Sequence, residues 1–242
     1  MKKTVSAFLF LTPLIAQANG SLGIFGTLSE SIYKDTDSKS RALPNISYEG
    51  ENFYFKLPEI GYRFLPQKSM QNLAVGVAYQ ASKFDPDDSS DTNIKQLDDR
   101  DDSVMAFASY QLGRMFKTKL AQDISGTHDG FSAEVELSYP MPVASWRVIP
   151  SISYSYMDSK MSNHAFGVSQ SESAQTGGTI AAYDSSSVSL VTYGIKAMYP
   201  VTKSVNIMLG VSQSKYDDDI LNSPLVEDDT VNSALAGIMV NF

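Results

Sequence analysis

Alternation of apolar and polar residues is the dominant pattern of this chain. In the closing segment, residues 231–242, every second residue from Ala234 onward is apolar, through Ile238, Val240 and Phe242, and the residues between them are smaller or mixed. A repeat of two residues places one set of side chains on one face of a β-strand. The segment therefore predicts a final strand with one apolar face, ending in an aromatic residue.

The same alternation recurs along the rest of the chain. Each alternating segment is roughly 9 to 13 residues long, the length that a tilted strand needs to cross a bilayer. No apolar run of about 18 residues follows residue 20, so the sequence predicts no transmembrane helix. The clearest alternating segments are 73–82, 104–112, 131–139, 146–156, 191–199 and 205–212.

The connections between these segments are alternately short and long. Short ones lie at 113–116, 141–144 and 200–203, and long polar ones at 85–102, 158–186 and 216–230. In outer-membrane barrels the short turns face the periplasm and the long loops face outward. With both ends of the chain in the periplasm, the number of strands must be even.

The strand count depends on residues 44–66. We expect a first strand over 21–33 and a polar loop over 34–43, after which the apolar alternation breaks at 49–52 and again near Pro58. Two turns would give twelve strands, and two bulges would give ten. Gly50 and Pro58 are turn residues, so we favour twelve. The predicted fold is all-β: a closed antiparallel transmembrane β-barrel with short periplasmic turns and long extracellular loops.

The first residues have the features of a secretory signal peptide. Lys2 and Lys3 precede an apolar stretch, and residues 16–18 read Ala-Gln-Ala. We expect cleavage between Ala18 and Asn19, with a signal peptide over 1–18 and a barrel domain over 19–242. Loss of the two lysines takes the net charge from −8 to −10. Such an acidic chain with no basic stripe is not expected to bind nucleic acid.

The absence of cysteine constrains how the exported protein is stabilised. An exported chain of this size without disulfides must draw its stability from a large closed structure.

The long loop at 85–102 is rich in carboxylates. It holds eight aspartates against Lys95 and Arg100. Such a density of oxygen ligands could hold Ca²⁺, but the spacing differs from the Asp-x-Asp-x-Asp-Gly pattern of a defined calcium loop. We therefore favour a solvated loop, and we expect no metal site and no cofactor.

His128 and His164 are the two histidines of the chain, and both fall in predicted external loops. Asp129 and Ser162 are close in sequence, which is the chemistry of a nucleophile and its base. Neighbours in sequence rarely form such a pair. We therefore predict a protein that is not an enzyme and has no catalytic residue.

Several charged residues fall on the inward face of the predicted strands. Glu136 lies diagonal to Arg147 if residues 141–144 form the turn, so the two could pair across strands. Such pairs would crosslink and close the lumen, whereas unpaired charges would line a narrow pore. The inward charges are Lys117, Lys119, Asp123, Glu134, Glu136, Arg147 and Lys196.

Several short motifs are spread along the mature chain. They lie at 44–50, 83–88, 96–101, 123–126 with His128 and Gly130, 166–169, 171–173, Tyr183 and 223–226. In order and spacing, over nearly all of residues 20–242, these motifs resemble those of the MipA/OmpV family of outer-membrane proteins. The chain departs from the family in Ala165-Phe166, where paired tyrosines are frequent, and in its Val240-Asn241-Phe242 ending.

The resemblance implies a structural role in the outer membrane. Family members are associated with holding a lytic transglycosylase near a bifunctional murein synthase, and others with adhesion. The implied partners are therefore outer-membrane lipid and lipopolysaccharide, and the two murein enzymes. A small-solute channel is the alternative function. We expect Phe242, Val240 and Ile238 to form the assembly signal of the barrel.

Overall fold

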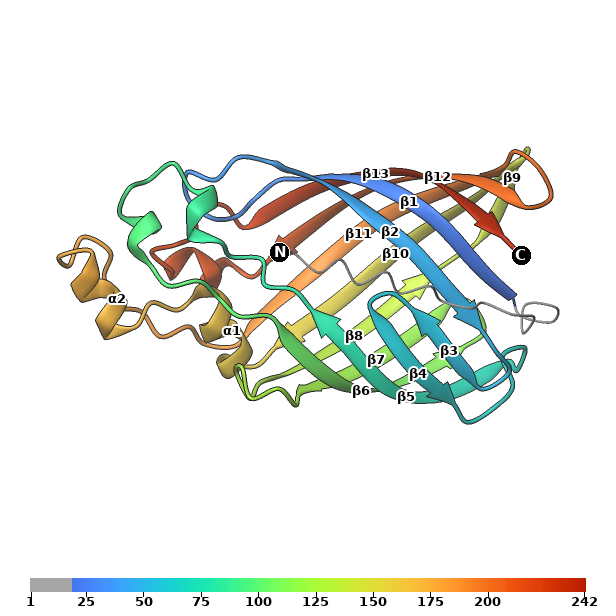
Figure 1. The fold of residues 1–242 in the computed structure, drawn as a ribbon, viewed down its shortest axis with the longest axis horizontal. Helices are drawn as coiled ribbons and strands as arrows, with labels where there is room; N and C mark the ends of the chain where they lie inside the picture. Colours follow the sequence, from blue (N-terminus) through green and yellow to red (C-terminus); the bar gives the residue numbers. More distant parts are fainter. Residues whose placement is uncertain (1–18) are drawn as a thin grey trace, which may run out of the picture.

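The computed structural model describes residues 19–242, so Ala18 and the predicted signal peptide lie outside the described residues. One antiparallel sheet closes on itself as a barrel (Figure 1). The first strand, β1 (Asn19–Ser29), pairs with the last, β13 (Thr230–Asn241). The circle is completed where β10 (Trp146–Met157) pairs with β11 (Val188–Pro200).

The wall contains twelve strands, as predicted. The sheet has 13 segments, but β8 and β9 share one neighbour, β10, in one register, with Ser138 opposite Ser151 and Met141 opposite Val148. They form one wall strand interrupted at Tyr139 and Pro140. The remaining segments are β2 (Lys39–Glu49), β3 (Phe53–Lys56), β4 (Glu59–Arg63), β5 (Gln71–Gln80), β6 (Ser103–Leu112), β7 (Phe116–Asp123), β8 (Phe131–Ser138), β9 (Met141–Val143) and β12 (Val205–Tyr216).

Both breaks in alternation between residues 44 and 66 are turns. One joins β2 to β3 at 50–52, and the other joins β3 to β4 at 57–58. The ends of the first external loop were predicted wrongly. The first strand ends at Ser29, and β2 begins at Lys39, within the predicted loop. Lys39 and Arg41 line a cavity inside the barrel, and charges on the lumen face made this part of β2 look like a loop.

Apolar side chains cover the outside of the barrel. On β13, Ile238 and Val240 are exposed, and on β1, Leu22 and Ile24 are exposed as well. In water such a surface would be unfavourable, whereas in a bilayer it faces hydrocarbon. Aromatic side chains gather at the end of the barrel that carries the short turns, including Tyr48, Phe53, Tyr62, Phe64, Trp146, Tyr199 and Phe242. This is the position of an interfacial girdle.

Side chains partly fill the lumen along β3 to β7. Lys119 forms an ion pair with Glu59 on β4, and its ammonium lies 4.4 Å from the centre of the Phe107 ring. The Arg63 guanidinium lies over Tyr54, whose ring packs on Gly61, where a Cβ atom would lie 2.4 Å from the ring. Any side chain at Gly61 would displace the tyrosine.

The predicted pair of Glu136 and Arg147 is wrong. Glu136 lies opposite Ser153, and Arg147 lies opposite Pro142 on one side and Met198 on the other. The turn sits at 144–145 instead of 141–144. Moving the centre of a hairpin by two residues shifts the register of its strands by four, which separates the two charges.

The carboxy-terminal residue closes the barrel at its turn end. The Phe242 N–H donates to the Gly20 carbonyl over 3.1 Å, and the Gly20 N–H donates to the Phe242 carbonyl over 3.0 Å. The Phe242 ring lies so close to Gly20 that a Cβ there would be 2.7 Å from it. The role of Phe242, Val240 and Ile238 as an assembly signal stays a prediction.

We expect deletion of Phe242 to lower the fraction of protein that migrates as a folded, heat-modifiable barrel. The deletion removes both terminal hydrogen bonds and an interfacial ring. The measurement is gel migration of outer-membrane fractions with and without boiling. Asn241→Ala, which keeps the aromatic terminus, is the matched control. Equal folded fractions for all three proteins would contradict this role of Phe242.

Candidate functional site

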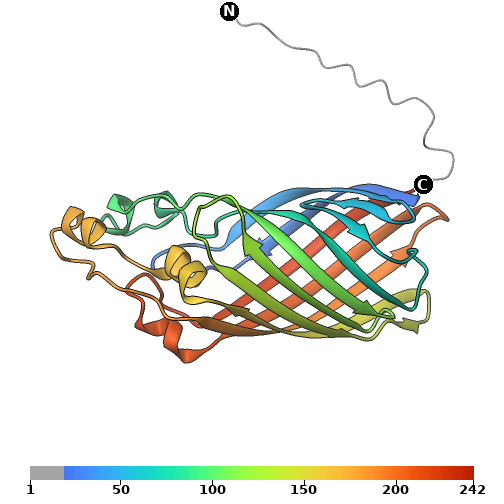
Figure 2. The same ribbon diagram turned by 90° about the horizontal axis from the view of Figure 1, so that it is seen from below.

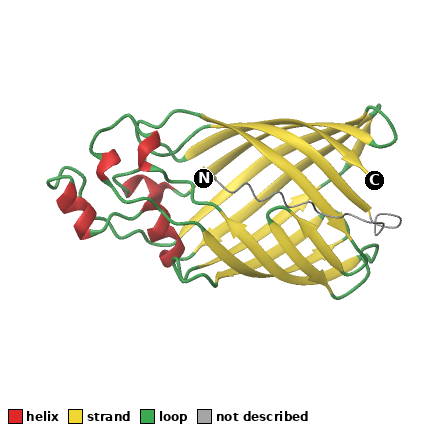
Figure 3. Cartoon of the chain, viewed as in Figure 1, coloured by secondary structure: helices red, strands yellow, loops and turns green. Residues whose placement is uncertain are grey.

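The long external connections fold together into a compact cap over one end of the barrel (Figures 2 and 3). We define the cap as residues 30–38, 81–102, 158–187 and 217–229. No helix within residues 19–242 is both long and apolar enough to cross a membrane. The helices of the cap are short: η2 (Pro86–Asp88), η3 (Ile94–Gln96), α1 (Ser159–Phe166), α2 (Gln170–Gln175) and η4 (Asp218–Asn222).

The cap has a hydrophobic core of its own. Leu225 is fully buried, and Ile94 and Ile220 are each 1% exposed. Every cap segment contributes, so the 85–102 loop, which was predicted to be solvated, in fact packs against the other segments through Ile94 and Leu97. The buried cluster comprises Ile32, Tyr33, Phe84, Ile94, Leu97, Phe166, Val168, Ile180, Val188, Tyr216, Ile220, Leu225 and Val226. Most of the stretches that carry the family resemblance lie in or beside it.

Local capping explains why helices form in segment 158–187. The Asp158 side chain accepts a hydrogen bond from the Met161 N–H at the start of α1. At α2, Ser169 accepts from the Glu172 N–H, and the Glu172 carboxylate accepts from the Ser169 N–H. This reciprocal pair is a capping box. It fixes the Glu172 carboxylate at the amino end of α2.

Arg100 joins the two largest cap segments. Its Nη1 donates to Glu172 Oε1 over 2.7 Å, and its Nε and Nη2 donate to the carbonyls of His164 and Gly167. Both charged side chains are nearly buried, with 9% and 5% exposed. We call this pair the seal, because it ties segment 81–102 to segment 158–187.

The electrostatics of the seal favour an ionised carboxylate. Burial alone would raise the pKa of Glu172, but the Ser169 N–H and the Arg100 guanidinium outweigh it and hold the pKa below its ordinary value. The first and last cap segments are each bound to α1 by one hydrogen bond from a side-chain hydroxyl group. Tyr33 Oη donates to the Ala165 carbonyl, and Ser223 Oγ donates to the Phe166 carbonyl over 2.7 Å.

Several aspartates of the 85–102 loop hold its local structure, either by accepting hydrogen bonds from nearby backbone N–H groups or by forming an ion pair. Asp85 accepts from the Asp87 N–H, and Asp91 accepts from the Asn93 N–H. Asp88 forms an ion pair with Lys39 on β2. Within residues 19–242 no group of three or more His, Cys, Asp or Glu side chains is arranged to hold a metal ion.

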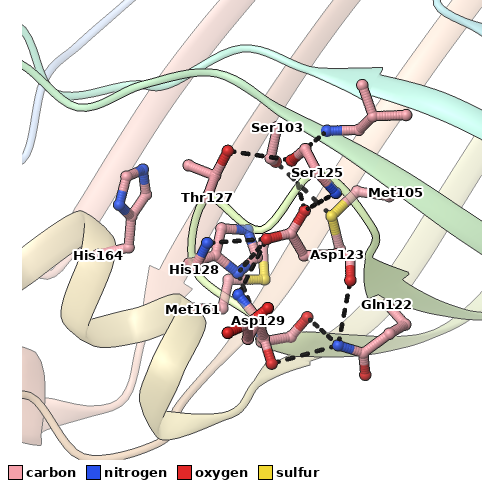
Figure 4. Close-up of polar contacts among 12 residues, drawn as sticks. Ser103, Met105, Gln122, Asp123, Ser125, Thr127, His128, Asp129, Met161 and His164 are labelled. Carbon is pink, nitrogen blue, oxygen red and sulfur yellow. Dashed lines mark hydrogen bonds and ion pairs between the residues drawn. The ribbon is translucent and has the colours of Figure 1, made fainter.

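Beneath the cap, Asp123 organises the loop between β7 and β8 (Figure 4). Its Oδ1 accepts from the N–H and hydroxyl of Ser125, and its Oδ2 accepts from the N–H groups of His128 and Asp129. The carboxylate is fully occupied, so it holds the loop and leaves no free oxygen for a ligand. It also keeps the His128 ring against α1.

The structure brings the two histidines together, with ring centres 5.4 Å apart. The Gly130 N–H donates to His128 Nδ1 over 2.9 Å. The hydrogen bond therefore assigns the proton of the neutral ring to Nε2, which is buried and has no partner in the described chain.

Burial lowers the pKa of His128, opposed by the charge of Asp123. Of the two residues considered as catalytic partners, Ser162 is hydrogen-bonded to Ser185, and Asp129 contributes its N–H to Asp123. These contacts show no nucleophile bonded to the base that would activate it.

A cavity of about 270 Å³ lies beside these histidines. Its lining includes His128, His164 and Met161 together with Lys83 and Tyr216. We call it the chamber. The sequence reasoning placed both histidines in external loops but missed the seal. The Ser-x-x-Glu pattern at 169–172 signals a capping box, whereas nothing local links Glu172 to Arg100.

We expect Arg100→Met to loosen the cap by about 3–5 kcal/mol, because it leaves the buried Glu172 carboxylate without its partner. The measurement is limited proteolysis and hydrogen exchange of residues 158–187 in the folded barrel. Heat-modifiability should be retained, since no wall strand changes. Adding Glu172→Gln should recover part of the loss, and the exposed Lys95→Met is the control. Equal protection in all variants would contradict the seal.

We expect the cap to weaken in two steps as pH falls. The pKa of His128 is lower in the folded protein than in the unfolded chain, where it is about 6.5. The contribution of His128 to the stability of the cap is therefore full above about pH 6.5 and declines below it, by at most about 1.4 kcal/mol per pH unit. The contribution of Glu172 is full above about 4.3 and is lost only as pH falls through its lower folded pKa. Proteolysis from pH 7.5 to 3.5 measures both steps.

Two variants assign these steps. His128→Gln should abolish the first step alone, and Glu172→Gln should abolish the second alone. A first step that persists in His128→Gln would rule out this assignment.

The chain is similar to known outer-membrane proteins. The profile of the family described as MltA-interacting protein MipA matches residues 22–242. The putative outer membrane protein YiaT of Escherichia coli (strain K12) is 27% identical over 240 residues, covering 97% of this chain and 96% of that protein. The MltA-interacting protein of the same strain is 27% identical over 234 residues, covering 94% and 93%.

Further relatives and solved structures are also outer-membrane proteins. OmpV of Vibrio cholerae is 27% identical, covering 91% of this chain and 84% of that protein. The crystal structure of Neisserial surface protein A is 12% identical with a TM-score of 0.26, covering 93% and 97%. The DcaP channel of Acinetobacter baumannii is 9% identical with a TM-score of 0.41, covering 93% and 96%. The protein resides in the outer membrane, and with a family match over nearly all of its barrel and cap, the chain belongs to the MipA family.

Proposed function

We propose that this protein is a non-enzymatic interaction protein of the outer membrane, with a barrel closed to solutes on the outer side. The observation that carries the proposal is the packed cap. Thirteen buried apolar residues and the nearly buried seal hold the external segments together. Open porins leave an aqueous channel, whereas here a solute would have to displace a hydrophobic core.

The relative named MltA-interacting protein supports a lytic transglycosylase as the partner. Such an enzyme would dock on the periplasmic rim, the set of short turns at 50–52, 64–70, 113–115, 144–145 and 201–204. A stable interface needs about 800 Å² from each side, which no single turn of this size provides. The rim as a whole is therefore the docking surface, and a bifunctional murein synthase would join through the enzyme.

A small-solute channel is the second candidate. A twelve-stranded barrel is wide enough for a lumen, and the filled region along β3 to β7 covers only part of it. In this case the cap is a gate that moves aside.

We expect the wild-type protein to show no steady conductance in planar bilayers at neutral pH and moderate voltage. Arg100→Met should produce intermittent openings, because it loosens the cap without changing the wall. Steady open channels in the wild type would overturn the closed barrel and favour the channel.

Binding to a purified lytic transglycosylase tests the partner. Lys68→Glu combined with Lys203→Glu alters two exposed positions of the rim, whereas Lys95→Glu alters the cap. We expect capture of the enzyme to fall with the rim variant and to be unchanged with the cap variant. Capture that is absent in the wild type, or lost equally in both variants, would refute docking on the rim.

A further inference from the structure

The barrel wall is incomplete between β2 and β5. The two strands that separate them, β3 and β4, have only four and five residues, whereas β2 has 11. β2 pairs with β3 only through 47–49, and the Leu57 N–H adds a bond to the Ile46 carbonyl. Residues 39–45 of β2 are paired with β1 alone. Figure 1 shows the short hairpin beside the much longer β2.

The backbone of β2 has an open edge above this hairpin. Backbone groups of a strand alternate between its two sides, so Pro44, Ala42 and Ser40 face the same way as the Ile46 carbonyl, away from β1. Proline lacks an N–H, so Pro44 removes one donor from this edge. Residues 40–44 are all exposed, although exposure alternates along most wall strands. We call the gap between 39–45 and the end of β5 the window.

An open edge at membrane depth needs a polar environment. Unpaired backbone groups are tolerated there only where they are buried in protein or line a water-filled cavity. A cavity of about 340 Å³ lies behind the window, lined by Arg41 and Leu43 of β2. It shares Tyr33, Lys83 and Phe166 with the chamber. The window therefore leads sideways from the bilayer into the space beneath the cap.

The lining of this cavity is cationic and rich in hydroxyl groups. Lys39 is paired with Asp88, but Arg41 and Lys83 have no carboxylate oxygen within 4.0 Å among residues 19–242. The one carboxylate in the lining, Glu30, already accepts two hydrogen bonds from Asn232. The hydroxyl residues are Thr27, Ser29, Ser31, Tyr33, Ser214, Tyr216 and Ser233.

We propose that the window admits the headgroup of an anionic glycolipid from the outer leaflet, while its acyl chains stay in the bilayer. Arg41 and Lys83 bind the anionic group, which satisfies two charges that the protein leaves unpaired. The hydroxyl groups and the open edge of β2 hydrogen-bond the sugar. The acyl chains cover the outer face of the window. A lipid is favoured over a soluble anion because the cap blocks the outer mouth.

The test uses the full mature chain refolded in detergent micelles, with lipid A, a phosphorylated and acylated disaccharide, as the probe. Native mass spectrometry measures the lipid retained by each variant. We expect Arg41→Gln with Lys83→Gln to bind about tenfold more weakly or worse, since two charge-assisted hydrogen bonds are lost. Lys68→Gln with Lys203→Gln changes the net charge equally at the periplasmic turns and should bind as the wild type does.

A second variant tests the route without changing any charge. Leu43→Trp narrows the entrance of the cavity and should lower lipid A retention while the barrel stays heat-modifiable. Equal retention by the wild type and the Arg41/Lys83 variant would overturn the proposal, as would equal retention of phosphatidylcholine and lipid A. Saturation by inorganic phosphate with no lipid retained would also overturn it.

Discussion

Closure of the sheet is the constraint on which this structure depends. In hydrocarbon every exposed backbone N–H and C=O must find a partner within the protein. The pairing of β1 with β13, from Ser21 opposite Asn241 to Ser29 opposite Ser233, removes the two edges that an open sheet would leave. Because this pairing is antiparallel, the strand number is even and the start of β1 lies beside the end of β13.

The chain solves two opposite solvation problems in one fold. The barrel faces its apolar side chains outward and keeps its charges inside, as a bilayer requires. The cap does the reverse, with Leu225 and Ile94 buried and carboxylates outside. Without cysteine, the cap relies on apolar burial and on the seal between Arg100 and Glu172. The geometry of the seal is fixed from both sides, because the capping box holds the Glu172 carboxylate and two backbone carbonyls hold the Arg100 guanidinium.

The sequence predicted the barrel well because each wall strand carries its own signal. A period of two is visible within ten residues, and Gly50 and Pro58 were sufficient to favour twelve strands. Register was harder to predict, because the turn near residue 144 lies two residues from its expected place and this error doubled across the hairpin. Lys39 and Arg41 concealed the start of β2, since a charge facing a wet lumen resembles a loop residue.

The cap could not be predicted in the same way. Its apolar residues, such as Ile94, Leu97 and Ile220, stand singly among polar neighbours with no period. They become a core only when four separate segments meet. The contact between Arg100 and Glu172 spans 72 residues, and only one half of it, the capping box, leaves a local pattern.

The cap covers the outer end of the barrel, and the window is the gap in the wall beside the short strands β3 and β4. A barrel with a packed cap offers solutes no axial route from outside, so a ligand that comes from the outer side would reach the space beneath the cap through the wall. The wall is weakest where β3 and β4 stop short, and there the chain has placed a proline on the edge and two unpaired cations behind it. An outward solute channel would need neither feature. The proposed binding of a lipid headgroup uses both.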